Sequence, residues 1–380
     1  MKTYNLIYAL LACIIIGCSK SENGTGTGDD NPVIDADYNL LVSKDGLLSS
    51  TLINATSEIT TLNPAKSPFE EMATPNLIYK DGAVLTSYHK DSDCSGTLSQ
   101  FNFADNSSSK YDLFKDFTDC DLTVTAIAHS NTKFFLTYHI DSSSEYFIRT
   151  IDPSTTESNF VDIPLRAVPS DPTFIPKELV FANQKLFVLG HDEDISNEYN
   201  IMVMNPSTNN LIHELELGFN VKQIFRNHND NVIISYNNLH TELDSDTMVE
   251  TYINYETNTA PNFTSSKFNS FDDGGRMYYE MPPGDFSSYA IIPAVYDFEG
   301  RLAILYAYEN FLSEAQRNFE YKIESTTMVG YDAKNDYILI GYKKLDSENK
   351  GGLMRIKPAP EPALIDNLDV DGLPYMLFVD

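Results

Sequence analysis

The chain has 380 residues, of which 42% are hydrophobic and 21% charged, so it can bury a core and does not belong to the disordered class. Its formal net charge is −29, which repels phosphate groups and argues against nucleic acid or anionic lipid headgroups as partners. The 23 Tyr and 22 Phe, without any Trp, favour β-strands.

The N-terminus has the features of a targeting segment. MKTYNLIYALLACIIIGC carries one basic residue near its start and an apolar run over residues 6–16, which is too short to span a bilayer. The run ends at Gly17-Cys18, and IIGC at this point resembles a bacterial lipobox, a signal in which the cysteine is acylated and becomes the mature N-terminus. We therefore predict a signal peptide at residues 1–17 and lipidation of Cys18. An uncleaved anchor is the alternative.

The next segment predicts a tether and an oxidising compartment. Residues 18–36 are rich in Gly, Ser, Thr, Asn and Asp without apolar periodicity, which indicates a flexible linker ahead of one domain at 37–380. Beyond the lipidated cysteine, the exported chain keeps Cys94 and Cys120. Such an even pair in an exported protein predicts a disulfide, with two free thiols as the alternative.

One pattern of strand, short polar turn and strand recurs along the rest of the chain, and most copies are followed by a third and a fourth strand. A repeat of about 45–50 residues with four short strands is typical of a β-propeller blade. The copies are LIYKDGAVLTSYH from 77, AIAHSNTKFFLTYH from 126, LVFANQKLFVLGH from 179, IFRNHNDNVIISYN from 224, AVYDFEGRLAILYAY from 294 and MVGYDAKNDYILIGY from 328.

The chain ends supply a seventh copy. Residues 38–43 read as a second strand with no first strand before it, and residues 375–379 as a first strand with no second strand after it. We predict an all-β, seven-bladed propeller that is closed by pairing of these two strands. The sixth blade is the doubtful one, because segment 311–323 would have to supply its outer strands, and 309–316 also fits a short helical turn.

Acidic loops follow the second strands, on the face where propellers usually bind ligands. Asp91, Asp93 and Ser95 resemble the first half of a calcium-binding loop, so Ca²⁺ is a candidate ligand there. A solvated rim rich in turn-forming residues is the simpler interpretation. A transition metal on the recurring histidines of three blades is disfavoured, because the blades hold these side chains apart.

A spacing irregularity points to a second candidate site. Second strands recur at a regular interval until residue 232, and the next one, in the hairpin from 294, comes about 70 residues later. We interpret 271–289 as an insertion between blades, where long insertions are often functional. Its bulky and basic residues suit a glycan, a siderophore or a peptide, and a merely tolerated insertion is the alternative; they are Arg276, Tyr278, Tyr279, Phe286 and Tyr289.

Linear catalytic motifs are missing from the sequence. It contains neither G-x-S-x-G nor H-E-x-x-H. A propeller hydrolase or lyase with polar residues at its channel mouth stays open, and we rank it below a binding protein.

The lipobox followed by a propeller resembles the outer-membrane and surface lipoproteins of Bacteroidota. The resemblance implies export to the outer membrane, on its periplasmic or outer side, and attachment through the N-terminal lipid. It also implies a monomeric ligand-capture or protein-interaction module, with an outer-membrane transporter or a small ligand as its partner.

Overall fold

The computed structural model describes most of the chain from residue 36 onward. The predicted signal peptide, the predicted lipidation site Cys18, the predicted tether through residue 35 and Cys120, the predicted disulfide partner of Cys94, lie outside the described residues. Within the described part, no helix is both long and apolar enough to cross a bilayer. The described ranges are 36–56, 59–117, 121–141, 145–153, 159–165, 174–192, 198–256, 260–263, 268–345 and 347–379.

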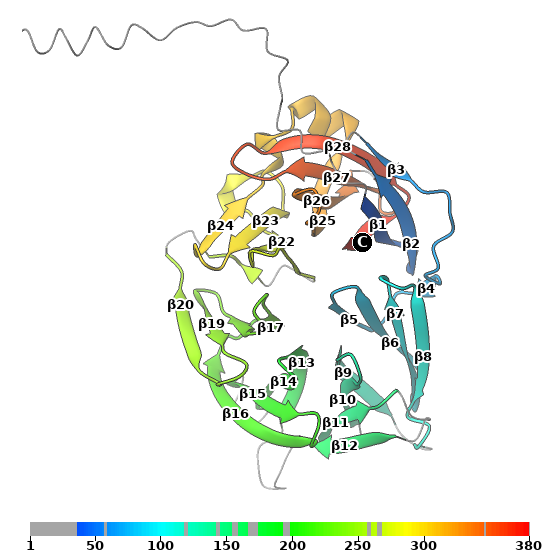
Figure 1. Ribbon diagram of the computed structural model, residues 1–380, viewed down its shortest axis with the longest axis vertical. Helices are drawn as coiled ribbons and strands as arrows, with labels where there is room; N and C mark the ends of the chain where they lie inside the picture. Colours follow the sequence, from blue (N-terminus) through cyan, green and yellow to red (C-terminus); the bar gives the residue numbers. More distant parts are fainter. Residues whose placement is uncertain are drawn as a thin grey trace, which may run out of the picture. The chain divides into compact units, whose positions relative to one another are not determined.

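The described residues form seven antiparallel sheets in one compact unit, which confirms the seven-bladed propeller. Figure 1 shows the sheets following one another round a common axis, with the first strand of each sheet nearest to it. Each strand alternates side chains between two faces, so a blade packs one face on the blade before it and the other on the blade after it.

The strands of blades two to four follow strictly in chain order. Blade two holds β5 (Leu77–Asp81), β6 (Val84–Ser92), β7 (Ser95–Asn102) and β8 (Ser107–Leu113). Blade three holds β9 (Leu122–His129), β10 (Phe134–Ile140), β11 (Tyr146–Ile151) and β12 (Phe160–Pro164). Blade four holds β13 (Phe174–Ala182), β14 (Lys185–Asp192), β15 (Glu198–Asn205) and β16 (Asn210–Phe219).

Blades five to seven repeat this order. Blade five holds β17 (Gln223–Arg226), β18 (Val232–Ser235), β19 (Leu239–Leu243) and β20 (Glu250–Asn254). Blade six holds β21 (Ser270–Phe271), β22 (Met277–Met281), β23 (Ile292–Asp297) and β24 (Leu302–Leu305). Blade seven holds β25 (Ile323–Asp332), β26 (Tyr337–Lys344), β27 (Gly351–Lys357) and β28 (Ala363–Val370).

Blade one joins the two ends of the chain, as the sequence predicts. The C-terminal β29 (Leu373–Val379) is its innermost strand and pairs with β1 (Ala36–Lys44). Two register partners in this ladder are Leu40 with Leu377 and Tyr38 with Val379. The outer strands are β2 (Leu47–Ala55), β3 (Thr60–Leu62) and the short β4 (Met72–Ala73).

Hydrophobic clusters between neighbouring blades hold the ring together. The described residues contain seven such clusters, and each one joins two consecutive blades. The cluster between blades seven and one contains Leu40, Leu339 and Leu353, all at most 1% exposed. The cluster between blades one and two contains Phe103 and Phe378, whose rings stack at 3.8 Å. Both neighbours of blade one are therefore packed against it.

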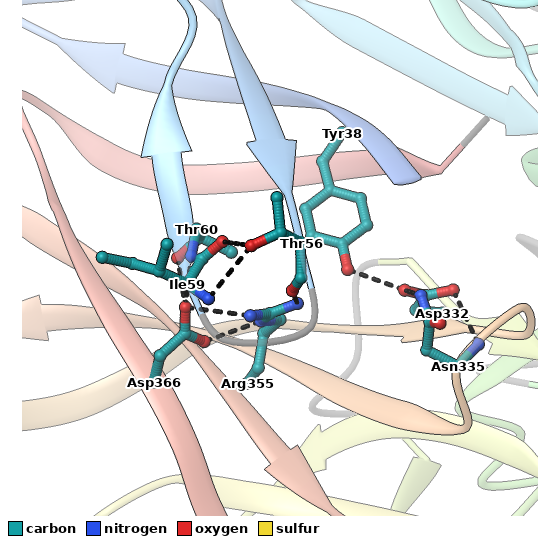
Figure 2. A network of polar contacts seen from close by, with 8 residues as sticks. All are labelled: Tyr38, Thr56, Ile59, Thr60, Asp332, Asn335, Arg355 and Asp366. Atoms are coloured by element: carbon teal, nitrogen blue, oxygen red, sulfur yellow. Dashed lines mark hydrogen bonds and ion pairs between the residues drawn. The ribbon is translucent and has the colours of Figure 1, made fainter. Parts of the chain in front are cut away.

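Polar contacts reinforce the closure between blades one and seven (Figure 2). Arg355 Nε donates to Asp366 Oδ1 at 2.7 Å, and its NH1 group donates to the Thr56 carbonyl at 3.0 Å. The Thr60 hydroxyl donates to Asp366 Oδ2 at 2.8 Å. The Tyr38 hydroxyl donates to Asp332 Oδ2 at 2.7 Å, from β1 to the end of β25. Each charge removed from water thus has hydrogen-bond partners.

The sixth blade differs from the sequence interpretation. The hairpin from 294 forms its third and fourth strands, because β21 and β22 in segment 271–289 are its first and second. That segment is therefore not an insertion, and the step from β18 at 232 to β22 at 277 is a regular 45 residues. The next step, from 277 to β26 at 337, is 60 residues.

The extra residues lie after β24 instead of before β23. They include the 3₁₀-helix η3 (Tyr308–Asn310) and the π-helix η4 (Gln316–Glu320), so segment 311–323 supplies no outer strand. The short helical turn expected near 309–316 is present in this form. A second 3₁₀ turn, η2 (Gly284–Phe286), lies in the β22–β23 loop.

Candidate functional site

The innermost strands enclose a cavity on the propeller axis. Its volume is about 870 Å³, and every one of the seven innermost strands contributes to its wall. Among the described residues of its wall, three are cationic, Lys80, Lys177 and Arg226, and three are acidic, Asp81, Glu178 and Asp230. The aromatic residues in its wall are Tyr79, Phe225, Phe268, Phe271, Tyr331, Tyr375 and Phe378. The cavity thus combines apolar surface with a small number of charged groups.

The wall chemistry follows from the position of these strands. An innermost strand pairs on one side only, so its other edge presents unpaired N–H and C=O groups to the cavity. Side chains from other blades bond some of these groups. The Phe181 N–H donates to the Tyr79 hydroxyl at 3.3 Å, and the Ile224 N–H donates to Glu178 Oε2 at 2.7 Å.

The Lys80 ammonium in this wall forms no ion pair with any carboxylate of the described residues. It stands near the end of β5, and its Nζ donates to the Leu377 carbonyl of β29 at 3.1 Å. The same Nζ lies 5.0 Å from the centre of the Phe378 ring. Burial lowers the pKa of Lys80 to about 8, because the charged form loses water and gains no carboxylate. Lys80 therefore has donors to spare for an anionic group.

Glu178 is the matching carboxyl group in the wall. The β13–β14 register shifts between Pro176 and Glu178, and such a bulge turns side chains away from the regular alternation. Burial raises the pKa of Glu178 to about 7, and the hydrogen bond from the Ile224 N–H and the positive charge of the neighbouring Lys177 oppose that shift only in part. Near neutral pH this carboxyl group is poised between its two protonation states.

Arg226 and two aspartates form a self-contained charged group at the end of the cavity near the β17–β18 turn. The Arg226 guanidinium is ion-paired with Asp81 of blade two, and its Nε lies 3.4 Å from Asp230 Oδ1. Its NH1 group also donates to the Phe181 carbonyl at 3.4 Å. This group therefore links blades two, four and five across the axis.

His129 supports the wall from behind. It is 3% exposed, and its Nδ1 lies 2.9 Å from the Thr86 hydroxyl. The Tyr79 ring meets it edge-on, with the ring centres 5.1 Å apart. Burial lowers the pKa of His129 to about 4, so the ring is neutral at pH 7. It positions Tyr79 without adding charge to the cavity.

None of the five residues predicted from segment 271–289 lines the cavity. Tyr278 and Tyr279 belong to β22 and are 1% and 0% exposed, because this strand is a core strand of blade six. Arg276 Nε is ion-paired with Asp272 at 2.6 Å, in the β21–β22 turn. Tyr289 packs on Tyr308 with ring centres 5.0 Å apart, and Phe286 is 66% exposed. Arg276 and the Tyr278 hydroxyl share Asp272 Oδ2, and Tyr278 and Tyr289 belong to one hydrophobic cluster, so these residues stabilise blade six and do not form the predicted ligand site.

The residues predicted to bind Ca²⁺ lie in the β6–β7 hairpin and contact separate partners. The Thr97 hydroxyl donates to Asp91 at 2.7 Å, Asp93 lies 3.7 Å from Lys90 Nζ, and the hydroxyls of Ser95 and Ser92 are 2.7 Å apart. Across the part of the chain that the structure describes, no group of three or more His, Cys, Asp or Glu could hold a metal ion. Calcium binding stays a prediction.

The remaining sequence-based candidates have local explanations. His139 Nε2 lies 3.0 Å from Asp141 of its own blade, and His191 packs against Tyr199 across its hairpin. Cys94 is disulfide-bonded. The pairing with Cys120 stays a prediction, because Cys120 is not among the described residues.

The sequence contains one signal for the cavity that the motif search missed. Lys80 and Arg226 interrupt apolar first strands in LIYKD and QIFRN. A charged residue in a strand that must be buried needs either a partner or a function. What the sequence cannot show is that these strands, about 150 residues apart, face one cavity.

No protein-family profile matches this chain, and no curated protein matches it. Solved structures share its fold. A candidate 6-phosphogluconolactonase from Bacteroides fragilis NCTC 9343 superposes with a TM-score of 0.51 at 10% identity, over 93% of this chain and all (100%) of the other. One from Bacteroides uniformis ATCC 8492 gives 0.49 at 12% identity, over 91% of this chain and 99% of that one.

A structure from work on two prolyl endopeptidases gives a TM-score of 0.48 at 10% identity. That match covers 90% of this chain, which spans about half, 49%, of the endopeptidase chain. Identities this low show the propeller fold and leave the function to be argued from the site.

Proposed function

We propose that this protein is a lipid-anchored propeller of the cell envelope that captures a small polar ligand in its central cavity. The observation that carries the proposal is the cavity of about 870 Å³ with walls from all seven blades. Sites that enclose small molecules have volumes of this order and combine apolar walls with a few polar groups. The charged and aromatic side chains described above supply that combination.

The anchor and the location rest on the sequence. The apolar run that ends at Gly17-Cys18 supports export and lipidation, and residues up to 35 would tether the propeller to the membrane. An outer-membrane transporter is the partner that this arrangement favours, with the propeller delivering the ligand. A Cys18→Ser variant should leave the membrane fraction of cells, and a variant that stays there would contradict lipid anchoring.

The capture function can be tested by filling the cavity. Ser270 of β21 lines the cavity, so Ser270→Trp places an indole in the space that a ligand would occupy. Ser108→Trp, on the exposed outer strand β8, is the matched control. The full-length proteins are purified from their own membranes in mild detergent, and the released small molecules are identified by mass spectrometry. A compound that accompanies wild type and Ser108→Trp, but not Ser270→Trp, would establish capture.

A hydrolase or lyase is the second candidate, and one observation favours it. The cavity brings Asp81, at the end of β5, into one wall with His228 and Asp230 of the β17–β18 turn. Because a similar fold occurs in a candidate 6-phosphogluconolactonase, lactone hydrolysis is the first assay. Turnover that is lost in His228→Asn would make the protein an enzyme, and a ligand that co-purifies unchanged would favour capture.

A further inference from the structure

The cavity carries balanced charge in a strongly acidic protein. The whole chain has a formal charge of −29, yet the residues of the cavity wall that the structure describes include three cationic and three acidic ones. Solubility alone does not explain why cationic and acidic side chains are equally frequent in the wall of the cavity. The balance indicates a ligand that carries both signs of charge, or neither.

Most of these charges are already engaged within the protein. Asp81 and Asp230 share the guanidinium of Arg226. Lys177 is exposed to water, and its Nζ donates to the Tyr199 hydroxyl at 2.8 Å and lies 4.8 Å from the centre of that ring. Two less exposed groups of the described wall remain for a ligand, the ammonium of Lys80 and the carboxyl group of Glu178.

Lys80 and Glu178 each keep hydrogen-bonding capacity toward the cavity. An ammonium has three donors, and the bond to the Leu377 carbonyl uses one of them. A carboxylate has two oxygens, and the Ile224 N–H occupies Oε2 of Glu178. Because an isolated charge in a buried wall is costly, a ligand that pairs with it gains affinity by relieving that cost.

We propose that the ligand is a free amino acid or short peptide, with its carboxylate on Lys80 and its ammonium on Glu178. This inference rests on the proposed capture function and specifies its ligand. The aromatic wall suits apolar side chains, and the unpaired edges of the innermost strands suit a peptide main chain. A neutral glycan would leave Lys80 and Glu178 unpaired. A polyanionic siderophore would be repelled by Glu178 and by the two aspartates that flank Arg226.

The test uses a random tripeptide library in equilibrium dialysis against the full-length protein in detergent. Two chemically matched libraries are dialysed in parallel, one amidated at its C-terminus and one acetylated at its N-terminus. Wild type should retain free peptides and lose about tenfold or more of that retention with either blocked library. Equal retention of free and blocked peptides would overturn the inference. This comparison uses wild type alone, so it does not depend on whether a variant folds.

Two variants then assign the two ends of the peptide. Lys80→Met should abolish the preference for a free carboxylate, and Glu178→Gln the preference for a free ammonium. Lys133→Met is the matched lysine control, because Lys133 donates to the Pro206 carbonyl at 2.5 Å outside the cavity. Glu242→Gln is the matched acid control, because Glu242 accepts from Asn227 and Asn231 and does not line the cavity. A preference that survives in both cavity variants would refute the assignment.

The outcomes separate this inference from the capture function. If wild type retains no tripeptide, but a compound still co-purifies and is excluded by Ser270→Trp, then capture stands and the peptide assignment fails. If no compound co-purifies either, both fail.

Discussion

Two residues in the cavity wall, Lys80 and Glu178, lower the stability of the folded protein. In this they differ from the apolar residues of a hydrophobic core. Burial lowers the pKa of Lys80 to about 8 and raises that of Glu178 to about 7, so each side chain resists its charged form in the folded protein. A Met and a Gln would fill the same positions at lower cost. Such costs recur at functional sites, where selection retains a side chain for what it binds.

Glu178 gives a pH-dependent prediction. Its carboxyl group binds a proton more tightly in the folded chain, where its pKa is about 7, than in the unfolded chain, where it is about 4.3. Its contribution to stability is therefore complete below about pH 4 and is lost as the pH rises through about 7. Glu178→Gln keeps an acceptor for the Ile224 N–H and cannot ionise.

We expect Glu178→Gln to unfold with a free energy about 2–3 kcal/mol above wild type at pH 8, and with almost the same free energy at pH 4. Urea denaturation at the two pH values measures this difference. Glu242→Gln should show no gain at pH 8. Equal stabilities of wild type and Glu178→Gln at pH 8 would mean that the carboxyl group is better solvated than its position indicates.

At the scale of elements, two blades share a buried arginine–aspartate ion pair between their third and fourth strands. Arg149 of β11 lies opposite Asp162 of β12, and Arg355 of β27 lies opposite Asp366 of β28. Each arginine is at most 2% exposed and also reaches the neighbouring blade. The NH1 and NH2 groups of Arg149 donate to Asp116, after β8, at 2.9 and 2.8 Å. These paired residues join each blade to its neighbour through buried charge in addition to apolar side chains.

Arg149 gives a prediction for this buried ion pair. Arg149→Met would leave Asp116 and Asp162 without their cation and would remove a guanidinium whose centre lies 3.8 Å from the centre of the Phe160 ring. Removing one partner of a buried ion pair typically costs about 3–5 kcal/mol, so we expect the free energy of unfolding in denaturant to fall by about 3 kcal/mol. Lys110→Met, which breaks an exposed pair with Glu70, should cause no measurable change. Similar losses in both variants would contradict the network's role.

The hairpins show which parts of the fold can be predicted from the sequence and which cannot. The sequence pattern predicts the hairpins β5–β6 and β25–β26 correctly. In both, a turn that contains Gly or Asn separates two apolar runs, and such hairpins are determined by their local turn residues. Blade six was misread because the hairpin β23 to β24 has the same pattern as a first hairpin, and β21 has only two residues. Periodicity identifies a hairpin, but only the packing of neighbouring blades assigns its place within a blade.

At the scale of the whole molecule, closure of the ring explains why the cavity site could not be predicted from the sequence. The blade number and the closure were predictable, since both follow from counting local copies and from the incomplete copy at each end. The cavity was not, because Lys80, Glu178 and Leu377 come from strands separated by about 100 and 200 residues and meet only when the ring closes. The site is therefore a property of the closed ring.

Closure of the ring gives the last prediction. A chain that ends at Asp371 lacks β29, so it loses the ladder to β1, the Phe103–Phe378 stack and the carbonyl that accepts from Lys80. Because blade one would then lack its innermost strand, neither of its neighbours could bury its apolar face fully. We expect the truncated chain to lose its single cooperative thermal transition, as followed by circular dichroism.

Two comparisons make this prediction specific to β29. A chain that ends at Val379 retains every β1–β29 pair and should melt like the full-length protein. A synthetic peptide of residues 372–380, added to the truncated chain, should restore the cooperative transition, since it can pair with the free edge of β1 as a separate strand. If the truncated chain melts cooperatively without the peptide, six complete blades close without the latch, and the cavity does not need the C-terminal strand.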